Sequence, residues 1–163
     1  MHADFESVIY KAETNYLQLP EVQAFKDCLV SLSERLVVYE CLRDRELEIF
    51  QPVAEQLIET LPGEKLEDLE MALKHWLSIL RYCAMAMLMN NPEFLQHRLL
   101  EWLAPVINAH NLTTIEQTLY QCLLSQLKTV LSKQQLSLLQ PFLAQVQTQT
   151  QSIDDRNLSQ IGA

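Results

Sequence analysis

Glycine is nearly absent from this sequence of 163 residues, where it occurs only as Gly63 and Gly162. Tight hairpins and phosphate-binding loops both need glycine, because their backbones adopt positive φ angles or come very close to a ligand. Its scarcity therefore argues against a protein of strands and turns and against a nucleotide-binding loop. The residues that dominate are leucine, glutamine, glutamate and alanine, which are strong helix formers. The composition predicts an all-α fold.

Basic side chains are also few, with 12 against 21 acidic ones, so the formal net charge is −9. Proteins that bind nucleic acids usually carry an excess of positive charge, so no nucleic-acid partner is expected. The longest apolar run, residues 76–89, is short and contains Ser78 and Arg81. It therefore predicts no membrane insertion, and we likewise expect no targeting leader.

The four cysteines form no CxxC pair and lie far apart, each within a predicted helix: Cys28, Cys41, Cys83 and Cys122. This pattern favours reduced thiols in a cytoplasmic protein over a disulfide framework or a zinc site.

Apolar periodicity divides the chain into helices separated by prolines. We predict a short helix near residues 5–16, a break at Leu19-Pro20, a second helix from about Pro20, and a third over 46–61 that contains Pro52. The second helix carries one apolar face, made of Val22, Phe25, Leu29, Leu32 and Leu36.

The second half of the chain follows the same pattern. A long helix is expected over 66–90, and another after Pro92 with Leu95, Leu99, Trp102, Leu103 and Val106. Two capping boxes, Thr113-x-x-Glu116 and Ser132-x-x-Gln135, open the last two helices, which should end near Leu131 and Val146. We predict a single domain over residues 1–147, with residues 1–40 as association helices and 148–163 as a flexible polar tail.

The helix over 66–90 raises the main functional question, because it is apolar on two sides. One stripe consists of Leu66, Leu69, Leu73, Trp76, Leu77, Leu80, Cys83, Ala84, Met87 and Leu88. The opposite face holds Met71, His75, Tyr82, Met85 and Met89. Such a helix is either a cofactor-binding element or a helix packed between neighbours, and the second interpretation is the more common.

No pattern of residues predicts catalysis or metal binding. His75 points away from the centre of the main stripe and is expected at the surface or in an interface rather than as a ligand. Cys83 lies on the buried stripe without a nearby histidine or carboxylate at helical spacing, so we expect a packing role. The charge cluster Arg43–Glu46 reads as a solvated face. The protein is therefore expected not to be an enzyme.

The order of the segments resembles the phycobilisome family of allophycocyanin and phycocyanin subunits. The similarity runs through "YKAETNYLQLPEVQAF", "LSERLVVYECLRDRELEIFQPVAEQLIETLP" and "LEDLEMALKHW", over about residues 8–146. Its anchors are Ala12, Tyr16-Leu17, Glu34-Arg35-Leu36, Arg43–Glu46, Gln56-Leu57, Pro62 and Arg81-Tyr82. The resemblance implies a globin-like helical domain with an N-terminal helical pair that contacts a partner subunit, and a cyanobacterial, photosynthetic context.

The chain departs from the family at the cysteine that attaches the bilin pigment. Alignment on "LEDLE" places Lys65 at that cysteine, and alignment on Arg81-Tyr82 places Leu69 there. Neither residue has the sulfur that a thioether bond requires. The segment between Pro62 and the long helix is also shorter than the family's chromophore-binding loop. We therefore expect no cofactor, and a non-pigmented protein that acts by protein–protein interaction in phycobilisome structure, assembly, turnover or regulation.

An alternative is a globin-like sensor or carrier that binds a bilin without a covalent bond. Asp68 could accept hydrogen bonds from pyrrole N–H groups, and Tyr82 and Met85 offer an aromatic and polarisable surface. These three residues are the candidates for such a site.

The expected partner is a second copy of the chain, a phycobiliprotein-like subunit or a linker, most simply in a dimer. The interface should use the apolar stripe of the first helix, namely Phe5, Val8, Ile9, Ala12 and Tyr16. The family's acidic and arginine positions before this tyrosine are Lys11 and Asn15 here, so the family's usual ion pair with a partner cannot form. The expected location is the cytoplasm, at the cytoplasmic face of the thylakoid with the phycobilisome.

Overall fold

The computed structural model describes the backbone of residues 3–97 and 113–161, and the side chains of residues 8–97 and 114–148. Every regular element in these ranges is a helix, which confirms the predicted all-α class. The elements are α1 (Ala3–Thr14), α2 (Leu19–Asp44), α3 (Glu46–Thr60), α4 (Leu66–Met89), α5 (Pro92–Leu95), α7 (Thr113–Val130) and α8 (Lys133–Ile161).

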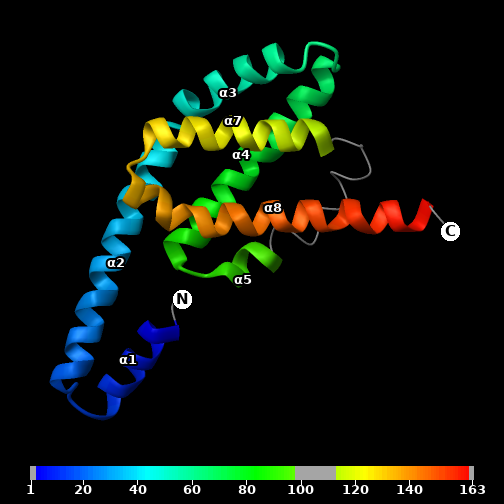
Figure 1. The fold of residues 1–163 in the computed structure, drawn as a ribbon. Coiled ribbons are helices and arrows are strands. Elements are labelled where there is room, and N and C mark those ends of the chain that lie inside the picture. The colour runs from blue at the N-terminus through cyan, green and yellow to red at the C-terminus, as the bar shows by residue number, and fades with distance from the viewer. Residues whose placement is uncertain (1–2, 98–112, 162–163) are drawn as a thin grey trace.

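The helices form a packed body from which an arm extends (Figure 1). Helix α4 lies at the centre of the body and contacts α2, α3, α5, α7 and α8. The C-terminal part of α2 belongs to this body, whereas its N-terminal part projects beyond it, and α1 folds back alongside that projecting part. We call α1 and the projecting part of α2, residues 3–34, the arm.

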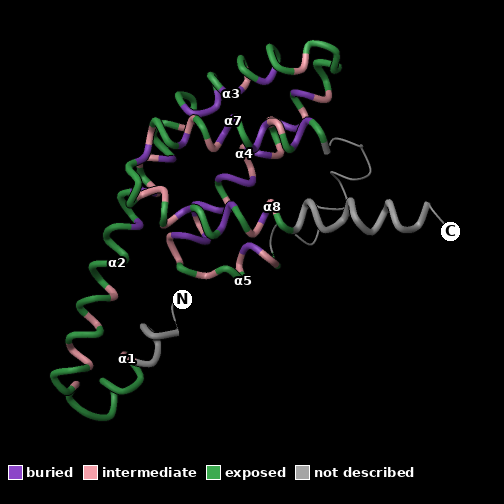
Figure 2. Tube along the Cα trace, in the orientation of Figure 1, coloured by how far each residue is buried: buried purple, intermediate pink, exposed green. Residues whose placement is uncertain are grey.

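Helix α4 is a sandwiched helix, as its two apolar faces predict. Trp76, Leu80 and Cys83 of the main stripe are buried, and Ala72, Ile79 and Ala86 add a third buried row with no exposed surface. Figure 2 shows that burial is concentrated in α4 and the helices around it, whereas the arm is largely exposed. The start of α4 differs from the prediction, because Leu66 lies at the edge of the body and remains exposed.

Arg35 joins α2 to the C-terminal end of α4. Its side chain is buried, and Nη1 donates hydrogen bonds to the carbonyl oxygens of Met87 at 3.3 Å and Leu88 at 2.9 Å. Its Nε donates to the carbonyl oxygen of Ser31 at 3.1 Å. The last carbonyls of a helix have no partner within the helix and carry a partial negative charge, so a guanidinium is well suited to bind them. Burial lowers the pKa of Arg35, but a guanidinium stays charged at neutral pH.

The chain turns sharply immediately after this contact. Asn90 adopts a left-handed conformation with φ of 48°, and its N–H donates to the carbonyl oxygens at the end of α4. Asn91 then caps α5, since its side-chain oxygen accepts a hydrogen bond from the Phe94 N–H at 3.2 Å. Asparagine is the residue after glycine that best tolerates this backbone, so the turn forms without a glycine.

One predicted boundary is confirmed and another is wrong. Helix α2 begins at Leu19, as the start predicted near Pro20 requires, and the break before it covers residues 15–18 rather than Leu19-Pro20. Proline fits the first turn of a helix, where its missing N–H has no partner to lose. The helix expected to end near Val146 continues to Ile161, since no proline or glycine follows until Gly162 and glutamine favours helix. The flexibility of residues 148–163 stays a prediction.

The two predicted capping boxes have different outcomes. The one at the start of α8 is confirmed, because the Ser132 N–H donates to Gln135 Oε1 at 2.9 Å and the Gln135 N–H donates to Ser132 Oγ at 3.2 Å. The other stays a prediction, because the side chain of Thr113 lies outside the described residues. Its partner Glu116 has Oε1 3.4 Å from His75 Nδ1 of α4. Pro52 lies in the interior of α3 rather than in its first turn.

His75 and Glu116 form a polar contact inside the packing of α4 against α7. Their side chains are only 16% and 5% exposed. One residue further along α4, the Trp76 ring packs against Tyr120 of α7 with ring centroids 5.4 Å apart. Glu116 Oε2 is buried without a hydrogen-bond partner among the described residues, so the contact of Oε1 with His75 matters for the satisfaction of this carboxyl group.

Replacing Arg35 by alanine should lower the free energy of unfolding by about 2–3 kcal/mol, because the carbonyls at the end of α4 lose a charged donor in a buried position. Chemical denaturation followed by circular dichroism measures this change. Lys74→Ala removes an exposed cation from α4 itself and should change stability by less than about 0.5 kcal/mol. Equal effects of the two substitutions would show that Arg35 has no special part in the packing.

Replacing His75 by leucine should cost about 1–3 kcal/mol, because it leaves the Glu116 carboxylate buried without its partner. The double variant with His75→Leu and Glu116→Leu should recover part of this loss, since removing both polar groups removes the unsatisfied one. Denaturation of the two single variants and the double variant gives the coupling between the residues. Strictly additive losses would contradict a direct interaction.

Candidate functional site

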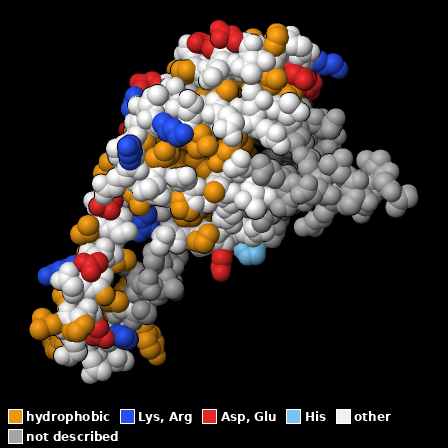
Figure 3. Space-filling view, viewed as in Figure 1, with side chains coloured by type: hydrophobic (Ala, Val, Ile, Leu, Met, Phe, Trp, Pro, Cys, Tyr) orange, Lys and Arg blue, Asp and Glu red, His pale blue; other side chains and the backbone are white. Residues whose placement is uncertain are grey.

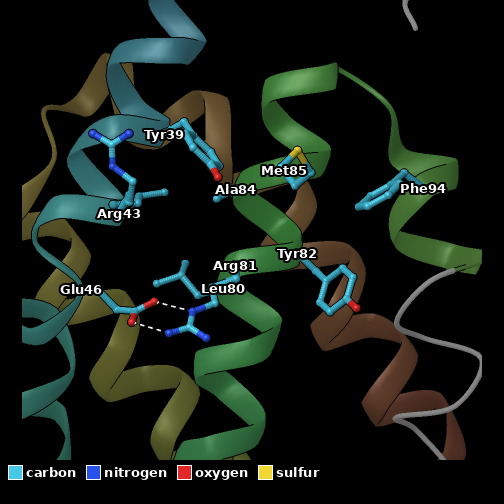
Figure 4. A pocket seen from close by; sticks show the side chains of 10 residues that line it. Tyr39, Arg43, Glu46, Leu80, Arg81, Tyr82, Ala84, Met85 and Phe94 are labelled. Carbon is cyan, nitrogen blue, oxygen red and sulfur yellow. Dashed lines mark hydrogen bonds and ion pairs between the residues drawn. The ribbon is translucent and has the colours of Figure 1, made fainter.

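A cavity of about 420 Å³ opens beside α4, on the side that faces α2 and α5. Four elements line it with ten residues: Tyr39, Leu42 and Arg43 of α2, Glu46 of α3, Leu80, Arg81, Tyr82, Ala84 and Met85 of α4, and Phe94 of α5 (Figure 4). The volume lies toward the lower end of the range for small-molecule sites, about 300–1,000 Å³. Figure 3 shows hydrophobic side chains over this part of the body with basic side chains beside them.

The apolar side of the cavity comes from consecutive turns of α4 and from α5. Leu80 and Ala84 lie one turn apart and are buried, whereas Met85 is half-buried. Across from Met85, the rings of Tyr82 and Phe94 pack with centroids 6.1 Å apart. Helices α4 and α5 therefore supply an aromatic pair, and the two arginines occupy the opposite part of the cavity (Figure 4).

The arginines of the cavity are both engaged by carboxylates. Arg81 makes a bidentate contact with Glu46, with Nε and Nη2 each 2.7 Å from a carboxylate oxygen. Arg43 does the same with its neighbour Asp44, at 2.7 and 3.0 Å. Hydrogen bonding to Arg81 lowers the pKa of Glu46, and hydrogen bonding to Arg43 lowers the pKa of Asp44. Each arginine is thus neutralised by a carboxylate. The cavity therefore suits an apolar ligand or side chain that lies between these ion pairs and the aromatic residues.

The pair of Glu46 and Arg81 corrects the interpretation of the charge cluster at the start of α3. Arg43, Asp44 and Arg45 are exposed as predicted, but Glu46 is half-buried and reaches across to α4. The two residues are 35 positions apart in the chain. No local pattern in the sequence could therefore have paired them, because both positions look like ordinary surface charges.

The candidate bilin-binding residues do not form one group. Tyr82 and Met85 both line the cavity, whereas Asp68 lies in the first turn of α4. The 14 residues between Asp68 and Tyr82 correspond to about 21 Å along the helix axis. A non-covalent site at the cavity would therefore consist of Tyr82 and Met85 without Asp68, and bilin binding by these residues stays a prediction.

The two positions that could replace the pigment cysteine lie in unlike surroundings. Lys65 is exposed and directly precedes α4, whereas Leu69 is buried in the core. The cavity offers no thiol for a thioether bond either, because none of the ten residues that line it is a cysteine. All four cysteines are free. Burial raises the pKa of the Cys83 and Cys122 thiols, and the full burial of Cys83 agrees with the packing role expected of it.

The predicted interface residues lie on the arm. Val8 is half-buried, Ile9 and Ala12 are exposed, and Tyr16 is 97% exposed in the linker between α1 and α2. The side chain of Phe5 lies outside the described residues. On α2, the predicted apolar face is present, and its members Leu29, Leu32 and Leu36 are exposed in the isolated chain.

Of the other histidines, the structure describes only His97, which is exposed beyond the end of α5. His2, His110 and the predicted apolar positions Leu99, Trp102, Leu103 and Val106 lie outside the described residues. Within residues whose side chains are described, no three histidine, cysteine or acidic side chains meet as a metal site would require. The helices of the described ranges also include none with the length and hydropathy of a membrane span.

Comparison with known protein families agrees with the resemblance seen in the sequence. Residues 8–150, most of the chain, match the family described as phycobilisome protein, and the all-α architecture is consistent with the globin-like fold of phycobiliproteins. A search among curated proteins finds no match. Members of the matched family are subunits of the phycobilisome, a light-harvesting antenna, and assemble with other phycobiliprotein subunits. The chain therefore belongs to the phycobilisome protein family.

Proposed function

We propose that this chain is a non-pigmented member of the family that acts by protein–protein interaction in phycobilisome structure, assembly, turnover or regulation, and not as an enzyme. The observation that carries this proposal is the exposed apolar face of α2. Leu29, Leu32 and Leu36 recur at helical spacing, so they form one row. Proteins that function as monomers rarely expose a continuous apolar surface of this kind.

The apolar row of α2 continues into the cavity. Tyr39 and Arg43 follow Leu36 at three and seven residues along the same helix, and both line the cavity. By helical spacing the row and the cavity therefore lie on the same side of α2, with charged side chains beside the apolar ones, as protein interfaces commonly have. Exposed Ile9 and Ala12 of α1 add to it on the arm. Its partner in this proposal is a second copy of the chain, another phycobiliprotein-like subunit or a linker, most simply in a dimer through residues 1–40.

Non-covalent binding of a bilin is the second candidate function. Tyr82 and Met85 favour it, because they place an aromatic and a polarisable side chain at the cavity. The paired arginines weigh against it, since neither guanidinium is free of a carboxylate. An absorption spectrum of protein purified from cells that synthesise bilins distinguishes the two functions. Visible absorption that is removed by denaturation followed by gel filtration supports non-covalent bilin binding, whereas a spectrum without visible absorption supports the first function.

The protein should carry no covalent bilin when it is produced together with bilin synthesis enzymes and lyases. The reason is the absence of a thiol at Lys65, at Leu69 and in the lining of the cavity. Zinc-enhanced fluorescence on a denaturing gel should be blank, with a pigmented phycocyanin subunit as the positive control. A fluorescent band that disappears in Cys83→Ala would contradict the proposal and reveal a displaced attachment site.

The protein should form a dimer that the double substitution Ile9→Asp and Ala12→Asp converts to a monomer, because two carboxylates would enter the apolar surface of α1. Sedimentation velocity measures the change. Leu47→Asp is the matched control, since Leu47 is an exposed apolar residue at the start of α3, outside the arm. It should leave the dimer intact. A monomer before substitution, or a dimer that persists after it, would exclude this interface.

A further inference from the structure

We infer that Glu21 is the positioning residue of the arm: its carboxylate holds α1 against α2 and so sets how α1 is presented to a partner. This inference rests on the proposed function, because it concerns the same association surface. It differs from the predicted interface in that Glu21 acts within the chain.

The two oxygens of the Glu21 carboxylate bind two different parts of the arm. Oε2 accepts a hydrogen bond from the backbone N–H of Gln18 at 2.9 Å, at the end of the linker. Oε1 lies 3.2 Å from Nζ of Lys11, in the last turn of α1. One side chain in the first turn of α2 therefore fixes both the entry of the chain into α2 and the end of the preceding helix.

The surroundings of the carboxylate favour its charged form. The Gln18 N–H bond lowers the pKa of Glu21 most, and the Lys11 ammonium lowers it further. Both contacts require an ionised acceptor for full strength. The position also suits the helix, since a carboxylate in the first turn of α2 and a cation in the last turn of α1 each complement the partial charges of the helix ends.

Helix α1 is short, and most of its described side chains are exposed. A helix of 12 residues is marginal in water by itself, and Ile9, Tyr10 and Ala12 are exposed. In the linker, Gln18 and Glu21 form a capping box at the start of α2, and Gln18 Nε2 also donates to the Tyr16 carbonyl oxygen at 3.4 Å. The Glu21 contacts thus join the linker, the end of α1 and the start of α2 at one side chain.

The ion pair also gives Lys11 a role. Its Nζ lies 3.2 Å from Glu21 Oε1 of the same arm. The ammonium charge is thereby paired within the chain, and contact with a partner is left to the apolar residues.

Hydrogen exchange measured by mass spectrometry on the full chain tests this inference. Peptides from α1 should exchange several-fold faster in Glu21→Ala than in the unchanged protein, and less so in Glu21→Gln, whose amide oxygen can still accept the Gln18 N–H bond. The exchanged pair Lys11→Glu with Glu21→Lys should protect α1 better than Lys11→Glu alone. Glu34→Gln is the matched control, as an exposed glutamate on the same helix, and should change nothing.

Two results would overturn the inference. One is equal exchange of α1 in Glu21→Ala and the unchanged protein. The other is faster exchange spread evenly over α1 and α4, which would mean a general loss of stability. Sedimentation of the same samples keeps the association proposal separate: weaker dimerisation of Glu21→Ala supports both, whereas a chain that is monomeric in every variant removes the dimer and leaves α1 exchange to decide the role of Glu21.

Discussion

The hydrogen bonds from Arg35 to the end of α4 are the contact on which the rest of the architecture depends. The body buries its apolar residues around α4, so whatever fixes the end of α4 also fixes α5 and the cavity beside it. Arg35 sits where α2 changes from a helix of the arm to a helix of the body. At this point a charged side chain of α2 reaches into the core and ties the base of the arm to the end of α4.

Much of the fold could be predicted from the sequence, because the signals that specify it act between residues close together in the chain. The positions of α2, α3, α4 and α8 follow from apolar periodicity, prolines and one capping box, all of which act within a few residues. The double-faced character of α4 was readable as well, since ten apolar positions occupy more of the helix than one contact could cover. The end of α8 at Ile161 could not be predicted. The apolar pattern stops near Val146, but a polar sequence without proline or glycine can continue as a helix.

The site depended more on contacts between distant residues. Glu46 and Arg81 look like surface charges in the sequence, and only the crossing of α3 and α4 brings them together. In the sequence, His75 looks like a surface or interface residue and Glu116 like part of a capping box. Only the packing of α4 on α7 brings the two side chains into contact. The cavity itself lies between elements that are each easily predicted. Its composition could not be foreseen, because the sequence gives no direct measure of how α2 and α5 approach α4.

The distribution of the thiols has a practical consequence. Cys83 and Cys122 are buried with raised pKa values, so thiolate-specific reagents will reach them only when the body opens. Cys28 and Cys41 are half-buried on α2, 13 residues or about 20 Å apart along the helix axis. Cys28 lies on the arm, and Cys41 lies on the part of α2 that belongs to the body. The natural sequence therefore offers two labelling positions, from which spectroscopic probes can follow the arm and the body separately without added cysteines.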